Sequence, residues 1–126
     1  MKPATILLVE DNPITRKMVR LALVPEGFTV IEAPDARSAI SLMVERPPDL
    51  VLQDLLLPDM DGLELVKLLR GLPGGDTVPI VAFSAFVYKL EEARGGPWFT
   101  DCLAKPIEPS RLLERVRAYT QPQVLR

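Results

Sequence analysis

The sequence predicts an α/β fold in which a parallel five-stranded sheet is doubly wound, with helices on both faces. Two patterns carry this prediction. Short apolar runs alternate with segments of helical periodicity along the chain, which is typical of successive βα units. The runs are also almost continuously apolar, as expected for strands buried on both sides. Right-handed crossovers should connect them.

The first two βα units occupy the N-terminal part of the chain. Residues 5–9 are predicted as a strand, and Asn12-Pro13 then joins a capping side chain to a proline suited to the first helical turn. A helix to about Val24 is predicted from apolar residues at helical spacing, which are Ile14, Met18, Leu21 and Ala22. A second strand is expected over residues 28–31. Asp35 caps a second helix, which ends at Pro47-Pro48 and has a predicted buried stripe of Ala36, Ala39, Ile40, Met43 and Val44.

The third and fourth strands are predicted over residues 50–53 and 79–83. Between them, a turn over residues 57–62 precedes a third helix, which Pro73-Gly74-Gly75 ends. Its apolar residues at helical spacing are Leu65, Val66, Leu69 and Leu72. Asp59 and Asp61 are interpreted as turn and cap residues rather than ligands, because aspartate before glycine is common at a helix start.

Residues 86–100 leave room for only a short fourth helix, because Gly95-Gly96-Pro97 interrupts the segment. Trp98 and Phe99 are interpreted as packing residues, with an exposed patch for a partner as the alternative. A fifth strand over residues 101–104 follows. Pro109 opens the last helix, before a tail over residues 121–123, with one face formed by Leu112, Leu113, Val116 and Tyr119.

Length and composition exclude several classes of protein and of catalytic site. The 126 residues predict one domain over residues 1–126 with a core over 5–120. A net charge of −2 with dispersed basic residues argues against direct nucleic-acid binding. About five apolar residues near the N-terminus are too few for a signal peptide or a membrane span, so a cytoplasmic location without membrane contact is expected. The absence of histidine excludes His-based metal sites and Ser-His-Asp or Cys-His catalysis. The single cysteine, Cys102, is expected to be buried.

Four of the predicted strands end in chemically reactive residues. Glu10-Asp11 follows the first strand, Asp54 the third, Ser84 the fourth and Lys105 the fifth. The carboxyl ends of parallel strands form the crevice where ligands bind in open α/β sheets. Three carboxylates gathered there require a compensating cation, and Mg²⁺ prefers such oxygen ligands. The cluster therefore suggests phosphoryl transfer onto a carboxylate.

The four motifs LLVEDN, LVLQDLLLPDMDG, IVAFSA and CLAKPI together resemble the receiver domain of bacterial two-component response regulators. The resemblance covers residues 5–120 and implies a flavodoxin-like strand order 2-1-3-4-5. It implies that Asp54 is the phosphoacceptor, that Glu10 and Asp11 hold Mg²⁺, that Ser84 is the switch hydroxyl and that Lys105 pairs with the phosphoryl oxygens. A carboxylate nucleophile needs no general base, because it is already ionised at neutral pH.

The resemblance also implies further site features and partners. The backbone carbonyl of Leu56 completes the Mg²⁺ ligands with Glu10, Asp11 and Asp54, and Pro106 corresponds to a cis-proline. The phosphoryl donor would be a sensor histidine kinase or a phosphotransfer protein. A separate downstream protein or a fused output domain would receive the signal, and the chain would be a monomer or a weak homodimer. Such a protein catalyses its own phosphorylation and dephosphorylation rather than turning over an external substrate.

Two departures from the family pattern affect the expected output and lifetime. Cys102 stands three residues before Lys105, where receivers usually have Tyr or Phe, so the aromatic part of the switch is absent. Its coupling to the face formed by the fourth helix, fifth strand and fifth helix is then in question. Leu56 and Phe86 lie two residues beyond Asp54 and Ser84, and we hypothesise that their apolar side chains hinder water and prolong the phosphorylated state.

Two alternative functions remain open from the sequence. The first is a phosphorylation-independent interaction or dimerisation module on a receiver fold, in which Asp101 and Arg115 pair between subunits. Cys102 and the short fourth helix favour it, whereas the intact acidic residues argue against it. The second is a metal-dependent phosphatase, which is weak because Leu56 stands where an acid would protonate the leaving group.

Overall fold

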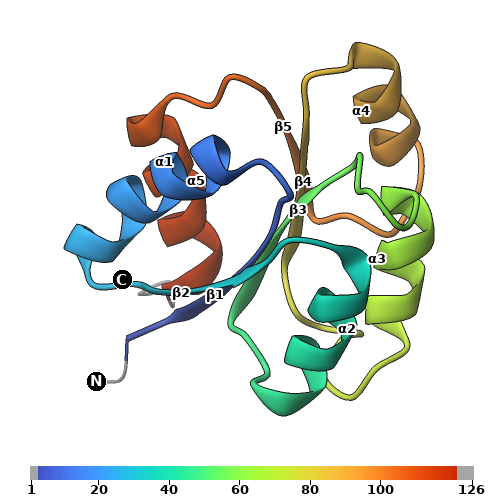
Figure 1. The fold of residues 1–126 in the computed structure, drawn as a ribbon, viewed down its shortest axis with the longest axis horizontal. Helices are drawn as coiled ribbons and strands as arrows, with labels where there is room; N and C mark the ends of the chain where they lie inside the picture. The colour runs from blue at the N-terminus through green and yellow to red at the C-terminus, as the bar shows by residue number, and fades with distance from the viewer. Residues whose placement is uncertain (1–2, 122–126) are drawn as a thin grey trace, which may run out of the picture.

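The computed structural model describes residues 3–121, which form a doubly wound α/β fold (Figure 1). Its five strands all pair in parallel in the order β2-β1-β3-β4-β5, which confirms the predicted fold class and strand order. The strands are β1 (Thr5–Val9), β2 (Thr29–Ala33), β3 (Leu50–Asp54), β4 (Ile80–Ser84) and β5 (Asp101–Ala104).

Helices cover both faces of the sheet. In Figure 1, α1 and α5 lie on one side of the strands, and α2, α3 and α4 lie on the other. The helices are α1 (Pro13–Leu23), α2 (Ala36–Glu45), α3 (Gly62–Arg70), α4 (Val87–Arg94) and α5 (Pro109–Thr120), with a 3₁₀ turn η1 (Val24–Glu26) after α1. The short fourth helix and the helix that Pro109 opens are therefore confirmed. No described helix has the length and apolarity needed to cross a bilayer.

Side chains of Asn and Asp start three of these helices, as the sequence predicts. Asn12 Oδ1 accepts hydrogen bonds from the backbone N–H groups of Ile14 and Thr15 at the start of α1. Asp35 does the same for α2, and Asp61 for α3. Because these caps satisfy N–H groups that have no partner within the helix, each helix begins at a defined residue next to the end of a strand.

The core consists of two main apolar layers, one on each face of the sheet. One layer lies under α1 and α5 and includes Leu8, Leu52 and Phe83. The other lies under α2 and α3, and Trp98 and Phe99 pack against it, which confirms their predicted packing role. A smaller cluster under α4 contains the buried free thiol of Cys102 with Leu55, Ala82, Leu90 and Ala93.

The apolar residues from which α1 was predicted do not form one buried stripe, because Ile14 and Leu21 face solvent whereas Met18 and Ala22 pack against the core. Ile14 and Leu21 are 78% and 65% exposed, whereas Val19 and Leu23 are fully buried. Two sets of apolar residues recur at helical spacing in α1, and periodicity alone does not say which set faces the sheet. The core of Phe28, Leu112 and Val116 buries the set that contains Val19 and Leu23.

Smaller corrections concern element ends and outer positions. In α2, Val44 is 54% exposed, and Leu72 lies beyond the end of α3. Strand β2 begins one residue later than predicted and continues to Ala33, because its pairing with β1 extends to Val9. Strand β3 ends one residue later than predicted, at Asp54, and β4 is shifted by one residue from 79–83 to Ile80–Ser84. The predicted tail over residues 121–123 lies mostly outside the described residues.

Candidate active site

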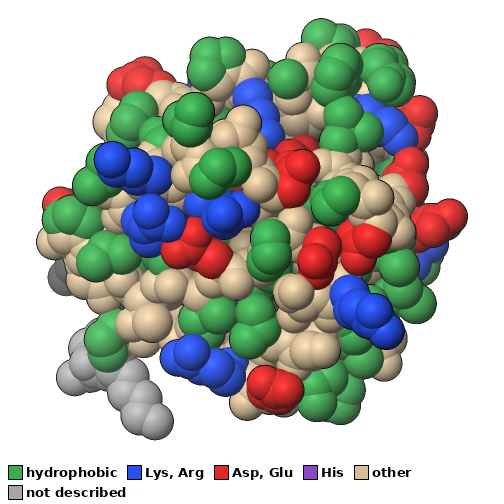
Figure 2. All heavy atoms as spheres, in the orientation of Figure 1, with side chains coloured by type: hydrophobic (Ala, Val, Ile, Leu, Met, Phe, Trp, Pro, Cys, Tyr) green, Lys and Arg blue, Asp and Glu red, His purple; other side chains and the backbone are tan. Residues whose placement is uncertain are grey.

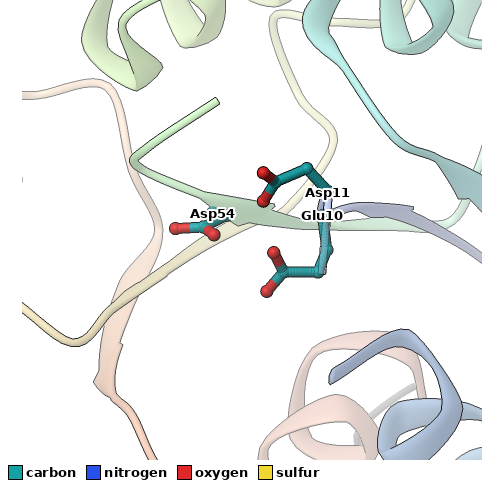
Figure 3. A group of neighbouring side chains, drawn as sticks. All are labelled: Glu10, Asp11 and Asp54. Carbon is teal, nitrogen blue, oxygen red and sulfur yellow. The ribbon is translucent and has the colours of Figure 1, made fainter. Parts of the chain in front are cut away.

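Three carboxyl groups gather where β1 and β3 end (Figure 3). Each of Glu10, Asp11 and Asp54 offers a carboxylate oxygen, and these oxygens lie within 4.8 Å of one another. The parallel register explains this meeting, because Val9 pairs with Gln53 and the next residue on each strand is acidic. Glu10 is fully buried and Asp54 is 5% exposed, whereas Asp11 faces solvent. The cluster therefore has a buried side and an open side.

Lys105 joins this cluster from the loop after β5. Its Nζ lies 2.6 Å from Glu10 Oε1 and 3.0 Å from Asp54 Oδ2. The backbone N–H of Lys105 donates to the Ser84 carbonyl at 2.9 Å, and the Lys105–Pro106 peptide bond is cis, as the resemblance implied. The distances show that residues 95 positions apart in the sequence share one site.

The electrostatics of the site follow from one ammonium group facing several acids. Burial raises the pKa of Glu10 to about 7, and the neighbouring Asp54 adds to the rise while Lys105 opposes it. For Lys105, burial alone would lower the pKa, but the hydrogen bonds that its ammonium group donates to Glu10 and Asp54 outweigh burial and raise the pKa. A further positive charge in the pocket would allow Glu10 to ionise at neutral pH.

The hydroxyl and backbone groups around Asp54 are also ordered by hydrogen bonds. Leu56 N–H donates to Asp54 Oδ1 at 3.1 Å, while the Leu56 side chain is 39% exposed. Ser84 is buried at the end of β4, and its Oγ accepts a hydrogen bond from Phe86 N–H at 3.1 Å. Phe86 is the residue before α4 and is 45% exposed, so the residues two positions beyond Asp54 and Ser84 both have partly exposed apolar side chains.

The loop between β3 and α3 contacts both helices beside it. Asp59 accepts hydrogen bonds from Ala36 N–H and Arg37 N–H at 2.9 and 3.0 Å, so it helps to cap α2. Asp61 caps α3 and forms an ion pair with Lys89 of α4 at 2.7 Å. Neither aspartate belongs to the acidic cluster found among residues 3–121, which confirms their interpretation as turn and cap residues.

Sequence reasoning missed Arg16, which holds the acidic segment from α1. Its Nη1 donates to the backbone carbonyls of Glu10 and Asp11, both at 2.9 Å. Arg16 also forms an ion pair with Glu32 of β2 at 3.1 Å. A basic residue one turn after Asn12 was the only signal in the sequence, and it does not reveal that the arginine folds back onto carbonyl groups.

Comparison with known proteins identifies the family. The sequence model of the response regulator receiver domain matches residues 6–117. An uncharacterized 14.6 kDa protein of Leptolyngbya boryana is 41% identical over 90% of this chain and 88% of its own length. The polar-differentiation response regulator DivK of Brucella anthropi is 32% identical over 93% of this chain and 96% of its own length.

A solved structure supports the same assignment. It is the receiver domain of a sensor histidine kinase from Pseudomonas aeruginosa, with a magnesium ion coordinated in its active-site cleft. It has a TM-score of 0.86 and 28% identity to this chain, and the match covers 95% of this chain and 99% of that one. The chain belongs to the response regulator receiver domain family of two-component signalling.

Proposed function

We propose that this chain is a phosphoacceptor of a two-component or phosphorelay system, and that Asp54 receives the phosphoryl group. The observation that carries the proposal is the position of Asp54, which is nearly buried between Lys105 at 3.0 Å and two further acids. A carboxylate held beside a cation and next to exposed Asp11 combines a nucleophile with groups that stabilise charge. We also infer that the receiver occupies residues 1–126 as one domain.

The acidic cluster fits Mg²⁺ by its donor chemistry. All the side chains offered by Glu10, Asp11 and Asp54 are oxygen donors, and one lysine does not balance three carboxylates. Asp11, Asp54 and the Leu56 carbonyl would hold the ion, with Glu10 acting through water. The similar kinase receiver, which has magnesium in its cleft, supports this choice. When bound, Mg²⁺ supplies positive charge to the oxygens of the incoming phosphoryl group.

The proposed reaction transfers a phosphoryl group from a phosphohistidine to Asp54. A carboxylate oxygen of Asp54 attacks phosphorus and forms an O–P bond as the N–P bond breaks, and the electron pair returns to the imidazole nitrogen. The phosphoryl oxygens would take the place of Glu10 as the partner of Lys105 Nζ. The partly exposed side chains of Leu56 and Phe86, two residues beyond Asp54 and Ser84, would hinder the water that hydrolyses the acyl phosphate.

The structure suggests a route for the output that does not need an aromatic side chain at position 102. Ser84 Oγ accepts a hydrogen bond from Phe86 N–H at the start of α4, and α4 has no other side-chain cap. If the Ser84 hydroxyl turns toward the phosphoryl group, this bond is lost and the start of α4 is released. The signal would then reach the face formed by α4, β5 and α5.

The start of α4 offers an exposed apolar surface for such an output. Val87 and Tyr88 are 68% and 57% exposed, and Figure 2 shows hydrophobic side chains gathered over this helix. Elsewhere on the same face, acidic and basic side chains are interspersed. We infer a downstream protein or a fused output domain as the receiver of the signal, rather than nucleic acid.

The remaining proposed partners follow from membership of the family. Sensor histidine kinases or phosphotransfer proteins are the proposed donors, in the cytoplasm, to a chain that is a monomer or a weak dimer. Asp101 accepts hydrogen bonds from Arg115 and Tyr119 within the chain. The pair proposed for a dimer interface is thus already satisfied internally, which favours the phosphoacceptor over the phosphorylation-independent module.

Intact-mass measurement tests the proposal. The chain is incubated with acetyl phosphate, with and without Mg²⁺, beside Asp54→Asn and the control Asp49→Asn, an aspartate before β3 that lies outside the cluster. We expect one added phosphoryl group on the wild type and the control, only with Mg²⁺, and none on Asp54→Asn. Equal labelling of all three chains would contradict the assignment of Asp54.

A further inference from the structure

Gln53 is a buried polar residue whose presence the apolar core does not explain. It lies in β3 immediately before Asp54 and is fully buried. Its Nε2 donates to the Gly62 carbonyl at 2.7 Å, while its Oε1 has no hydrogen-bond partner among the described residues. A buried amide with one oxygen unsatisfied is less favourable than an apolar side chain of the same size. The hydrogen bond that the Gln53 side chain makes to Gly62, its one side-chain hydrogen bond among residues 3–121, is therefore the place to look for its role.

The partner of Gln53 closes the loop that follows Asp54. Gly62 N–H donates to the Leu55 carbonyl at 3.1 Å, and an antiparallel bridge joins Leu56 to Asp61. The two backbones are in such close contact that a Cβ on Gly62 would lie 2.6 Å from Leu55 Cα. Gly62 and Leu55 thus form the base of the loop, and Gln53 holds this base from the sheet.

Leu56 is the next residue from this base and the one whose carbonyl is proposed to face the metal. Its N–H donates a hydrogen bond to Asp54 Oδ1 at 3.1 Å. The orientation of its carbonyl, on the other side of the residue, then depends on how the loop base is held. Mg²⁺ requires near-octahedral ligand geometry and tolerates small displacements poorly. A carbonyl ligand on a loop therefore needs support from a rigid element.

We propose that Gln53 is a positioning residue, which fixes Gly62 to the sheet and so sets the Leu56 carbonyl for Mg²⁺ binding. The part of this inference that concerns Mg²⁺ rests on the proposed function. The part that concerns the loop does not, because the hydrogen bond from Gln53 to the Gly62 carbonyl involves none of the proposed metal ligands. Because Oε1 has no hydrogen-bond partner among the described residues, the amide of Gln53 adds little to the stability of the core. Its hydrogen bond to the loop is the contribution that an apolar side chain could not make.

Gln53→Met tests the role, since methionine has a similar volume and neither donates nor accepts strongly. Val51→Ala is the matched control, because Val51 is buried on the same strand and two residues away, and alternation places it on the same face. Three quantities are measured on each chain: the urea midpoint, the exchange rate of the Gly62 amide without metal, and the Kd for Mg²⁺ by calorimetry.

We expect Gln53→Met to keep or raise the urea midpoint, while Gly62 exchange becomes faster and the Kd for Mg²⁺ rises by about tenfold. Val51→Ala should lower the midpoint and leave the Kd within about twofold, because the Val51 side chain makes no hydrogen bond to the loop base. If Gln53→Met retains both the wild-type Gly62 exchange and the wild-type Kd, the positioning role is wrong.

The same measurements separate this inference from the proposed function. If the wild type binds no Mg²⁺, the proposed function fails, and the exchange of Gly62 alone decides the role of Gln53. Faster exchange in Gln53→Met then supports its hold on the loop, and unchanged exchange overturns it.

Discussion

The metal-free protein should become less stable as the pH rises from about 5 to 8, and Glu10 should be the main cause. Its pKa is raised from 4.5 to about 7 in the folded chain, chiefly by burial. A group with a raised folded pKa contributes its full stability below the unfolded pKa and loses it as the pH rises through the folded value. The difference between the two values corresponds to roughly 3 kcal/mol, at about 1.4 kcal/mol for each tenfold change in proton affinity.

Glu10→Gln removes this titration while it keeps the shape of the side chain. Urea unfolding in EDTA at several pH values should show wild type and Glu10→Gln with similar free energies of unfolding near pH 5. By pH 8 the variant should be more stable by roughly 3 kcal/mol. Glu45→Gln, which changes an exposed glutamate at the end of α2, is the matched control and should follow the wild type. Parallel curves for wild type and Glu10→Gln would refute the reasoning.

Three further changes test other parts of the structure. Gly62→Ala should lower the free energy of unfolding by about 1–3 kcal/mol in urea, because its Cβ would lie 2.6 Å from Leu55 Cα, and an unchanged midpoint would contradict this contact. Leu56→Asn should shorten the lifetime of the acyl phosphate, measured by loss of the added mass, and equal lifetimes would remove the idea of an apolar barrier. Arg70→Met should lower the free energy of unfolding by about 1–3 kcal/mol and change Trp98 fluorescence, because the Arg70 guanidinium donates hydrogen bonds to the carbonyls of Gly75, Val78 and Trp98. An unaltered fluorescence spectrum would contradict this role of Arg70.

The fold and the meeting of the acidic residues were predictable from local patterns. The strands were predominantly apolar runs, and the residues at the strand ends had to meet once the sheet was parallel. Glu10, Asp54 and Lys105 therefore needed no knowledge of loop conformation to be placed together. Caps such as Asn12 and Asp61 were predictable for the same reason, since they act on the residues that follow them directly.

The features that the sequence did not predict depend on contacts between distant segments. The rotation of α1, which buries Val19 and exposes Ile14, is set by packing against α5 and the sheet. Arg70 reaches carbonyls on two separate loops, and Asp59 caps a helix that precedes it in the chain. From the sequence, Gln53 was predicted only as a strand residue, because no neighbouring residue in the sequence indicates that its side-chain amide reaches Gly62.

The most direct test of the central claim is a crystal structure of the chain soaked with Mn²⁺ in place of Mg²⁺. The anomalous signal of the metal locates the ion without assumptions about its ligands. We expect one strong peak within about 2.0–2.4 Å of carboxylate oxygens of Asp11 and Asp54 and of the Leu56 carbonyl. A strong peak elsewhere, with none between these groups, would contradict the claim that these acids form a metal-dependent phosphoacceptor site.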